Sequence, residues 1–285
     1  MGGILTYGLA VILYAALAAH FWRTRWRQVP GAGAAAAPAV GAAAWERWAI
    51  AVPFALHTAL LYSVIFEAVE LRFGFGHALS ATLWLAVVFY WFESLFYRLE
   101  GMQPAILGAA ALCVPLPAIF PGLESQAYAQ SLEFRLHLVL SMTAYGLFTI
   151  AVLQAALMGL IEKRLHGRSL GEELTGPLAS LPPLLTLETL LFRILAAGFV
   201  LLTLTLLTGV AFSETVFGRA FRFNHKTLFA VLSWAIFGLL LAGRHLYGWR
   251  GRRALRWTVA GFAVLLLAYV GSRFVLEVVL GRSLA

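Results

Sequence analysis

Apolar stretches about 20 residues long recur from one end of this 285-residue sequence to the other. A helix rises about 1.5 Å per residue and the hydrocarbon core of a bilayer is about 30 Å thick, so a spanning helix needs roughly 20 apolar residues. We therefore predict an all-α polytopic transmembrane bundle of about eight helices. The candidate spans lie at about 3–22, 48–68, 77–97, 104–120, 132–160, 188–212, 226–246 and 255–279.

The fourth stretch is the weakest of these spans. It is short, and Pro115 and Pro117 lie near its end, where each removes a helical hydrogen bond. Seven helices and one re-entrant segment are the alternative that this stretch leaves open.

Composition indicates that lipid is the main solvent of the chain. Hydrophobic residues make up 61% and charged residues 12%, which is more apolar surface than one soluble core can hide. The formal net charge of +8 does not indicate a nucleic-acid partner, because the Lys and Arg residues lie between apolar runs and not on a hydrated face. The partner that composition predicts is a lipid bilayer.

The basic residues predict the orientation of the bundle. With eight spans, three clusters fall on one side, which the positive-inside rule makes cytoplasmic, so that both termini are extracytoplasmic. Arg135, Arg219, Arg222 and Lys226 fall on the other side and weaken the asymmetry without reversing it. The three clusters are Arg23, Arg25, Arg27 and Arg47; Lys163, Arg164 and Arg168; and Arg244, Arg250, Arg252, Arg253 and Arg256.

Three parts follow from these patterns. Residues 1–27 hold the first transmembrane helix, residues 28–44 are an Ala/Gly/Pro-rich cytoplasmic linker, and residues 45–285 form the main transmembrane domain. We find no internal repeat and no acidic residue at mid-membrane, and both absences from the sequence disfavour a secondary transporter.

Histidines are the residues best suited to carry chemistry, because the usual motifs of soluble enzymes are absent from the sequence. Ionisable side chains within a membrane are costly and usually face the bundle interior. His57 lies near mid-bilayer in the second span, where its imidazole either bonds a neighbouring helix or binds a cofactor.

A polar stripe runs along the fifth span, where His137, Ser141 and Tyr145 repeat at four-residue intervals. We expect this stripe to face protein. His225 opens the seventh span at a similar outer depth, where it is either solvated or able to join His137 on one haem iron, as in bis-histidine sites.

His245 lies at the cytoplasmic end of the same span as His225. The 20 residues between them correspond to about 30 Å of helix, so the two cannot ligate one metal. Amid Arg244 and Arg250, His245 either contacts lipid phosphate or pairs with His57, although the depths of those two histidines match less well.

Five segments of the sequence carry a resemblance to a known family: LHLVLSMTAYGLF, LPPLLTLETLLFRI, LLTLTLLTGVAFSE, FNHKTLFAVLSWAIFGLLLAGRHLYGWRGRR and LAYVGSRFVLEVVL. They resemble the membrane cytochrome c assembly proteins of the CcsA/ResC group, and most closely their smaller YpjD- and HemX-like members. The resemblance spans most of the chain and is strongest from about 132 to 278.

The resemblance implies residue roles and a cofactor. It implies that His137 ligates haem at the outer surface and that a position close to His245 binds haem within the membrane, while His57 matches a histidine of YpjD-like members. It implies non-covalent, b-type haem in a bacterial cytoplasmic (inner) membrane. The implied partners are another membrane subunit of cytochrome c assembly or apocytochrome c.

Covalent haem attachment is not implied for this chain. The family's haem ligases carry a WGxxWxWD-type loop, but this sequence has SETVFGRAFRFN there, which speaks against an enzyme. The single cysteine, Cys113, excludes a CxxCH haem-attachment motif and a thiol pair. The sequence thus predicts a haem-binding or haem-handling protein. The alternative is an accessory membrane protein that regulates a transporter or a haem-synthesis enzyme without binding a cofactor.

Overall fold

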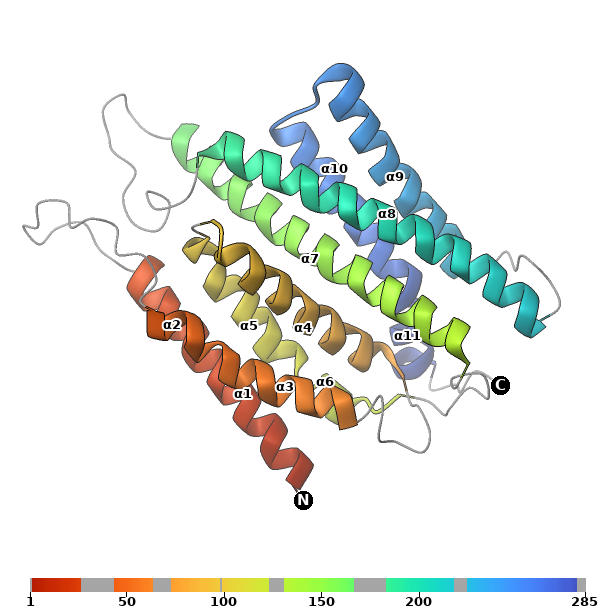
Figure 1. The fold of residues 1–285 in the computed structure, drawn as a ribbon, viewed down its shortest axis with the longest axis horizontal. Coiled ribbons are helices and arrows are strands. Elements are labelled where there is room, and N and C mark those ends of the chain that lie inside the picture. Colours follow the sequence, from red (N-terminus) through yellow and green to blue (C-terminus); the bar gives the residue numbers. More distant parts are fainter. Residues whose placement is uncertain are drawn as a thin grey trace, which may run out of the picture.

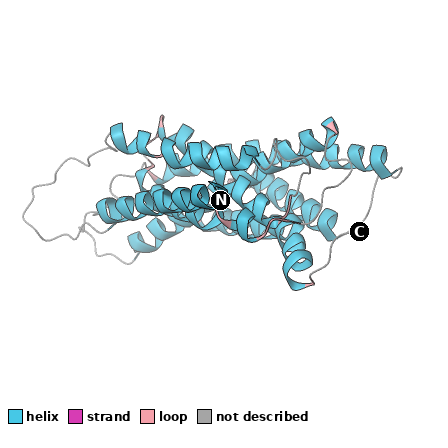
Figure 2. Cartoon of the chain, turned by 90° about the horizontal axis from the view of Figure 1, so that it is seen from below, coloured by secondary structure: helices cyan, strands magenta, loops and turns pink. Residues whose placement is uncertain are grey.

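A computed structural model describes residues 2–26, 44–63, 73–97, 99–122, 131–166, 183–217 and 225–280. All the regular elements in these ranges are helices (Figure 2). Six of the described helical segments are long and apolar enough to cross a membrane, so the fold is the predicted transmembrane helical bundle. They are Gly3–Thr24, Phe75–Ser94, Leu132–Lys163, Leu184–Ala211, His225–Tyr247 and Arg252–Val279.

The N-terminal half of the chain forms one group of packed helices (Figure 1). Helix α1 packs against α3 and α5, and α4 packs against the same two helices from the other side. The elements are α1 (Gly2–Phe21), α2 (Ala44–Ala49), α3 (Ala51–Tyr62), α4 (Phe75–Ser94), α5 (Gln103–Cys113) and α6 (Leu116–Ile119), with a π-helical turn η1 (Trp22–Trp26) and a 3-10 turn η3 (Glu100–Met102).

The C-terminal half forms a closed four-helix bundle, which we call the second bundle. Helices α7, α8, α9 and α10 pack in a ring in that order, with α10 returning to α7. The elements are α7 (Leu132–His166), α8 (Leu184–Phe217), α9 (His225–Tyr247) and α10 (Arg252–Leu266), followed by the π-helical turn η5 (Leu267–Gly271), α11 (Ser272–Phe274) and a second π-helical turn, η6 (Val275–Val279).

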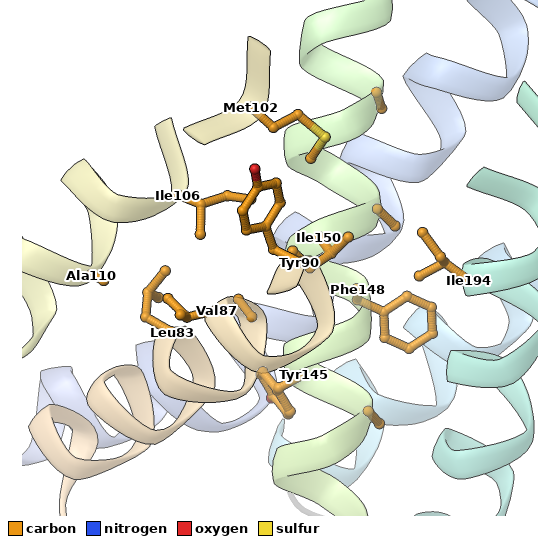
Figure 3. Packing of buried hydrophobic residues seen from close by; sticks show 14 of the residues in the cluster. Leu83, Val87, Tyr90, Met102, Ile106, Ala110, Tyr145, Phe148, Ile150 and Ile194 are labelled. Carbon is orange, nitrogen blue, oxygen red and sulfur yellow. The ribbon is translucent and has the colours of Figure 1, made fainter. Parts of the chain in front are cut away.

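The two groups join where α4 packs along α7. Gly146 lets these helices come close, because a Cβ at this position would lie 2.7 Å from the Leu85 Cβ atom. Figure 3 shows the buried side chains around this seam, with Tyr90 of α4 next to Ile106 and Phe148 of α7 next to Ile194. One continuous apolar core therefore connects both groups.

The described chain runs along the bundle eight times, and six of these passes are helices as long and apolar as a membrane span requires. Besides the six long helices, α2 with α3 makes one pass and α5 with α6 makes another (Figure 1). The α5–α6 pass is broken at Pro115, which is the N-cap of the four-residue helix α6. The described chain accordingly starts and finishes at the same end of the bundle.

Helices α7 and α8 are longer than the sequence predicts. We predicted spans at about 132–160 and 188–212, but α7 continues to His166 and α8 runs from Leu184 to Phe217. Their 35 and 34 residues give about 50 Å of helix, so both project beyond a 30 Å hydrocarbon layer. Most of the predicted linker, 28–43, lies outside the described residues.

Candidate functional site

The polar stripe of α7 faces protein, as predicted. The Tyr145 hydroxyl donates a hydrogen bond to the Leu265 carbonyl of α10 at 2.6 Å, and Ser141 is buried. The His137 imidazole turns toward α8, where its Nδ1 atom lies 3.1 Å from the Thr208 hydroxyl. The three side chains therefore face the neighbouring helices of the second bundle and not lipid.

The contact with Thr208 allows a tautomer to be assigned to the His137 ring. The Thr208 hydroxyl has one hydrogen, and backbone carbonyls of its own helix lie within its reach, at 2.8 Å for Leu204 and 3.1 Å for Thr205. We assign that hydrogen to these carbonyls, so that the Nδ1–H group of His137 donates to the Thr208 oxygen. Nε2 keeps its lone pair, which is the form that ligates a metal, with the other ring nitrogen held by an outer hydrogen bond.

Gly209 allows the His137 ring to lie close to α8. A Cβ at position 209 would be 3.2 Å from the ring Cε1 atom, which is tighter than an ordinary van der Waals contact. Thr208 and Gly209 therefore orient His137 together. The sequence reasoning missed both, although the threonines that interrupt the apolar run TLTLLTG were a signal of a polar face.

Phe148 of α7 and Phe237 of α9 set the relative depth of these two helices. Their rings stack across the bundle with centroids 3.9 Å apart. Since α7 and α9 run in the same direction and these residues are 89 positions apart (237 minus 148), His137 lies level with about position 226. His225 and Lys226 are thus at the depth of His137.

The same register indicates which side chains face the bundle axis. Eleven residues are about three helical turns, so His137 shares the face of Phe148 and Lys226 shares the face of Phe237. His225 is exposed and lies about 120° round the helix from the Phe237 face. The geometry brings His225 to the depth of His137 and places Lys226 on the facing side.

His57 is enclosed in the N-terminal group, where it is 1% exposed. Its Nε2 atom lies 2.9 Å from the Ser80 hydroxyl, and the Tyr14 ring meets it edge-on with centroids 5.9 Å apart. The His57 Nδ1 atom and the Tyr14 hydroxyl are buried without a hydrogen-bond partner. Helices α1, α3 and α4 therefore contribute to this polar cluster. Neither Tyr14 nor Ser80 was expected from the sequence.

His245 is exposed at the opposite end of α9 from His225. Next to it, Arg244 bonds Glu188 of α8 at 2.5 Å and also lies over the Phe192 ring. Helices α3 and α9 lie on opposite sides of the molecule, with α4 and α7 between them (Figure 1). The structure does not bring His57 and His245 together.

Within the described residues, no three His, Cys, Asp or Glu side chains gather as a protein-only metal site requires. Haem iron needs only one or two axial ligands from the protein, because the porphyrin fills the other positions. The donor arrangement at His137 fits an axial ligand.

Comparison with known proteins identifies related sequences. A family model described as cytochrome C assembly protein matches residues 45–280. Inner membrane protein YpjD of Escherichia coli K12 is 35% identical over 143 residues, which cover 50% of this chain and 52% of that protein. Cytochrome c biogenesis protein CcsA of Prochlorococcus marinus strain MIT 9515 is 38% identical over 88 residues, covering 31% of this chain and 28% of that protein.

A protein from the nifR3-like 5' region of Azospirillum brasilense is also similar, at 35% identity over 147 residues, 51% of this chain and 52% of that protein. The chain thus spans about half the length of the first of these relatives. No solved structure matches the chain. Helix α1, which supplies Tyr14, lies outside the region that the family model matches.

Proposed function

Because the chain belongs to the cytochrome c assembly family, we propose that it is an inner-membrane protein that binds and handles haem in cytochrome c biogenesis. The family match at residues 45–280 supports the proposal of one main transmembrane domain at 45–285. The YpjD relative supports the inner membrane as location, and the CcsA relative supports the biogenesis role. Partners of the proposed function are another assembly subunit or apocytochrome c.

The orientation of His137 is the observation that carries this proposal. Its Nδ1–H group is held by Thr208, Nε2 has a lone pair, and Gly209 keeps the backbone of α8 clear of the ring. A histidine oriented by an outer hydrogen bond is the usual arrangement of a metal ligand. We assign His137 as an axial ligand of the haem iron.

His225 is the proposed second ligand. It lies at the depth of His137 on the diagonally opposite helix, and it is the first residue of α9. To reach the iron, the first turn of α9 must rotate His225 toward the bundle axis, because the side chain is exposed in this structure. The proposal therefore predicts a smaller loss of haem on removing His225 than on removing His137.

The bound haem would be b-type and would supply a redox-active, transferable iron centre. Cys113 is the only cysteine in the chain and no tryptophan occurs at 213–224, so we propose non-covalent binding and delivery without a haem-attachment reaction. In this scheme the chain's own residues bind, orient and release the cofactor.

His57 and His245 are proposed as separate contacts. The free Nδ1 atom of His57 is a buried ring nitrogen whose desolvation is uncompensated, and a metal or water ligand would satisfy it. His245, exposed at the inner end of α9, would bind haem from the inner surface. Neither can share an iron with His137, because His57 lies in the other helix group and His245 lies at the other end of the second bundle.

The visible spectrum of the full chain in detergent tests the proposal. We expect a Soret band after haem addition, strongly reduced in His137→Ala and partly reduced in His225→Ala. His166→Ala is the matched control, because it removes the histidine at the opposite end of α7 from His137.

A protein that gains no Soret band at any haem concentration would refute the haem proposal. It would favour the accessory role, in which the bundle regulates a transporter or a haem-synthesis enzyme. Equal spectra for all three variants would leave haem binding in place and refute the ligand assignment.

A further inference from the structure

Three charged residues gather at the outer end of the second bundle: Lys226 of α9, and Arg273 and Glu277 on α11 and η6. The Arg273 Nη1 atom lies 3.8 Å from the Glu277 Oε1 atom, and Lys226 interacts electrostatically with both residues. We call Lys226, Arg273 and Glu277 the outer charge cluster. It holds two cations and one carboxylate.

One oxygen of the carboxylate in the outer charge cluster is engaged elsewhere. Glu277 Oε2 accepts a hydrogen bond of 3.3 Å from the Phe75 backbone N–H at the start of α4. A carboxylate at this position also offsets the positive end of the helix dipole. The Arg273 Nε atom and the Glu277 Oε1 atom are both buried without a hydrogen-bond partner, and the Arg273 guanidinium lies 5.7 Å from the centroid of the Tyr269 ring. The outer charge cluster therefore retains excess positive charge and a free donor.

Both cations lie at the depth of His137. The stack of Phe148 on Phe237 places Lys226 level with His137 and on the axis-facing side of α9. Helices α7 and α10 run in opposite directions, and the bond from Tyr145 to Leu265 fixes their register. His137 lies eight residues outward from Tyr145, and Arg273 lies eight residues outward from Leu265, so these two residues are also at the same depth.

We propose that Lys226 and Arg273 bind the carboxylate side chains of the porphyrin whose iron His137 ligates, an inference that rests on the proposed function. A porphyrin of the haem b type carries two carboxylates on one edge, and these require cationic donors at the membrane rim. Charge-assisted hydrogen bonds are short and strong, and they strengthen where water is excluded. Glu277 positions Arg273 and anchors the start of α4.

Porphyrins with free and esterified carboxylates test this assignment on the unaltered full chain in detergent. Metal-free protoporphyrin, followed by its fluorescence, reports carboxylate recognition without iron ligation. We expect it to bind about tenfold or more tightly than its dimethyl ester, since a charged hydrogen bond contributes about 1.5–3 kcal/mol and 1.4 kcal/mol is tenfold. Lys226→Gln should remove most of this preference and leave the affinity for the ester unchanged.

Lys163→Gln is the matched control, because it removes an exposed cation from the opposite end of α7. Equal affinity of the unaltered chain for the acid and the ester would overturn the inference even if haem binds through His137. The inference also fails if Lys226→Gln weakens the binding of both ligands alike. An acid preference of the unaltered chain together with an unchanged Soret band in His137→Ala would support the inference and refute iron ligation by His137. A chain that binds no porphyrin overturns both.

Discussion

The two ends of the second bundle differ in how their charged side chains are paired and buried. At the inner end, Arg244 and Arg250 both lie close to Glu188, Arg252 bonds Glu162 at 3.0 Å, and Arg253 lies over the Trp249 ring. At the outer end, Lys226 and Arg273 share one carboxylate that also caps α4. The two ends differ in burial: the side chains of Arg250 and Arg252 are 63% and 60% exposed, whereas that of Arg273 is 12% exposed.

This difference separates structural charge from functional charge within one bundle. Removing one partner of a buried ion pair is destabilising, so paired charges are explained by folding alone. At the outer end, two partly buried cations share one carboxylate at the depth of an oriented imidazole, and buried charge is costly within a membrane. The contrast assigns stability to the inner end and ligand binding to the outer end.

The contrast depends on the orientation of the bundle in the membrane, and a reversed orientation would remove it completely. We predict that both chain ends lie outside the cytoplasm, because the basic clusters lie at the other end of the bundle. An alkaline phosphatase reporter fused after Ala285 should be fully active, and the same reporter after Arg168 should be inactive. The reverse pattern would place the His137 end in the cytoplasm.

The Glu188–Arg244 pair offers the largest expected effect on stability. Glu188→Gln leaves the Arg244 guanidinium, whose side chain is 26% exposed, without its anion. We expect a loss of about 2 kcal/mol in the free energy of unfolding, measured by denaturant titration in detergent, with haem affinity unchanged. Arg244→Gln and the double variant complete a cycle that isolates the pair. A haem defect as large as the stability defect would contradict the division between the two ends.

Gly209→Ala should give a smaller effect, confined to the outer end. The new methyl group would press on the His137 ring at 3.2 Å and move it by a few tenths of an ångström. We expect haem to bind about fivefold more weakly, which corresponds to about 1 kcal/mol, by titration of the Soret band. Gly108→Ala is the control, because a Cβ there meets nothing within 4 Å. If both variants bind haem equally well, the close packing at Gly209 has no part in orienting His137.

Much of the fold follows from hydropathy alone. The lengths of the apolar runs predicted the transmembrane bundle, and the two prolines predicted the break between α5 and α6. The continuation of α7 to His166 was missed, because its last turns are polar and the predicted span ended where the apolar residues end, at about 160. Hydropathy locates the membrane-embedded part of a helix and not its ends.

The candidate site was only partly predictable. The four-residue spacing of His137, Ser141 and Tyr145 predicted a protein-facing stripe, because helical periodicity fixes which residues share a face. The partners on α8 and the level of Arg273 depend on the register between helices, which no local pattern encodes. For the same reason, the sequence proposed His225 as the residue opposite His137, whereas the register places Lys226 on that face.

Chemical rescue of His137 tests the central claim most directly. His137→Gly removes the proposed axial ligand and leaves space for free imidazole beside Thr208 and Gly209. We predict that the Soret band of haem-loaded protein is lost in His137→Gly and returns on addition of imidazole, while His166→Gly keeps its band with or without imidazole. An unchanged spectrum in His137→Gly would contradict the assignment of the outer end of the second bundle as the haem site.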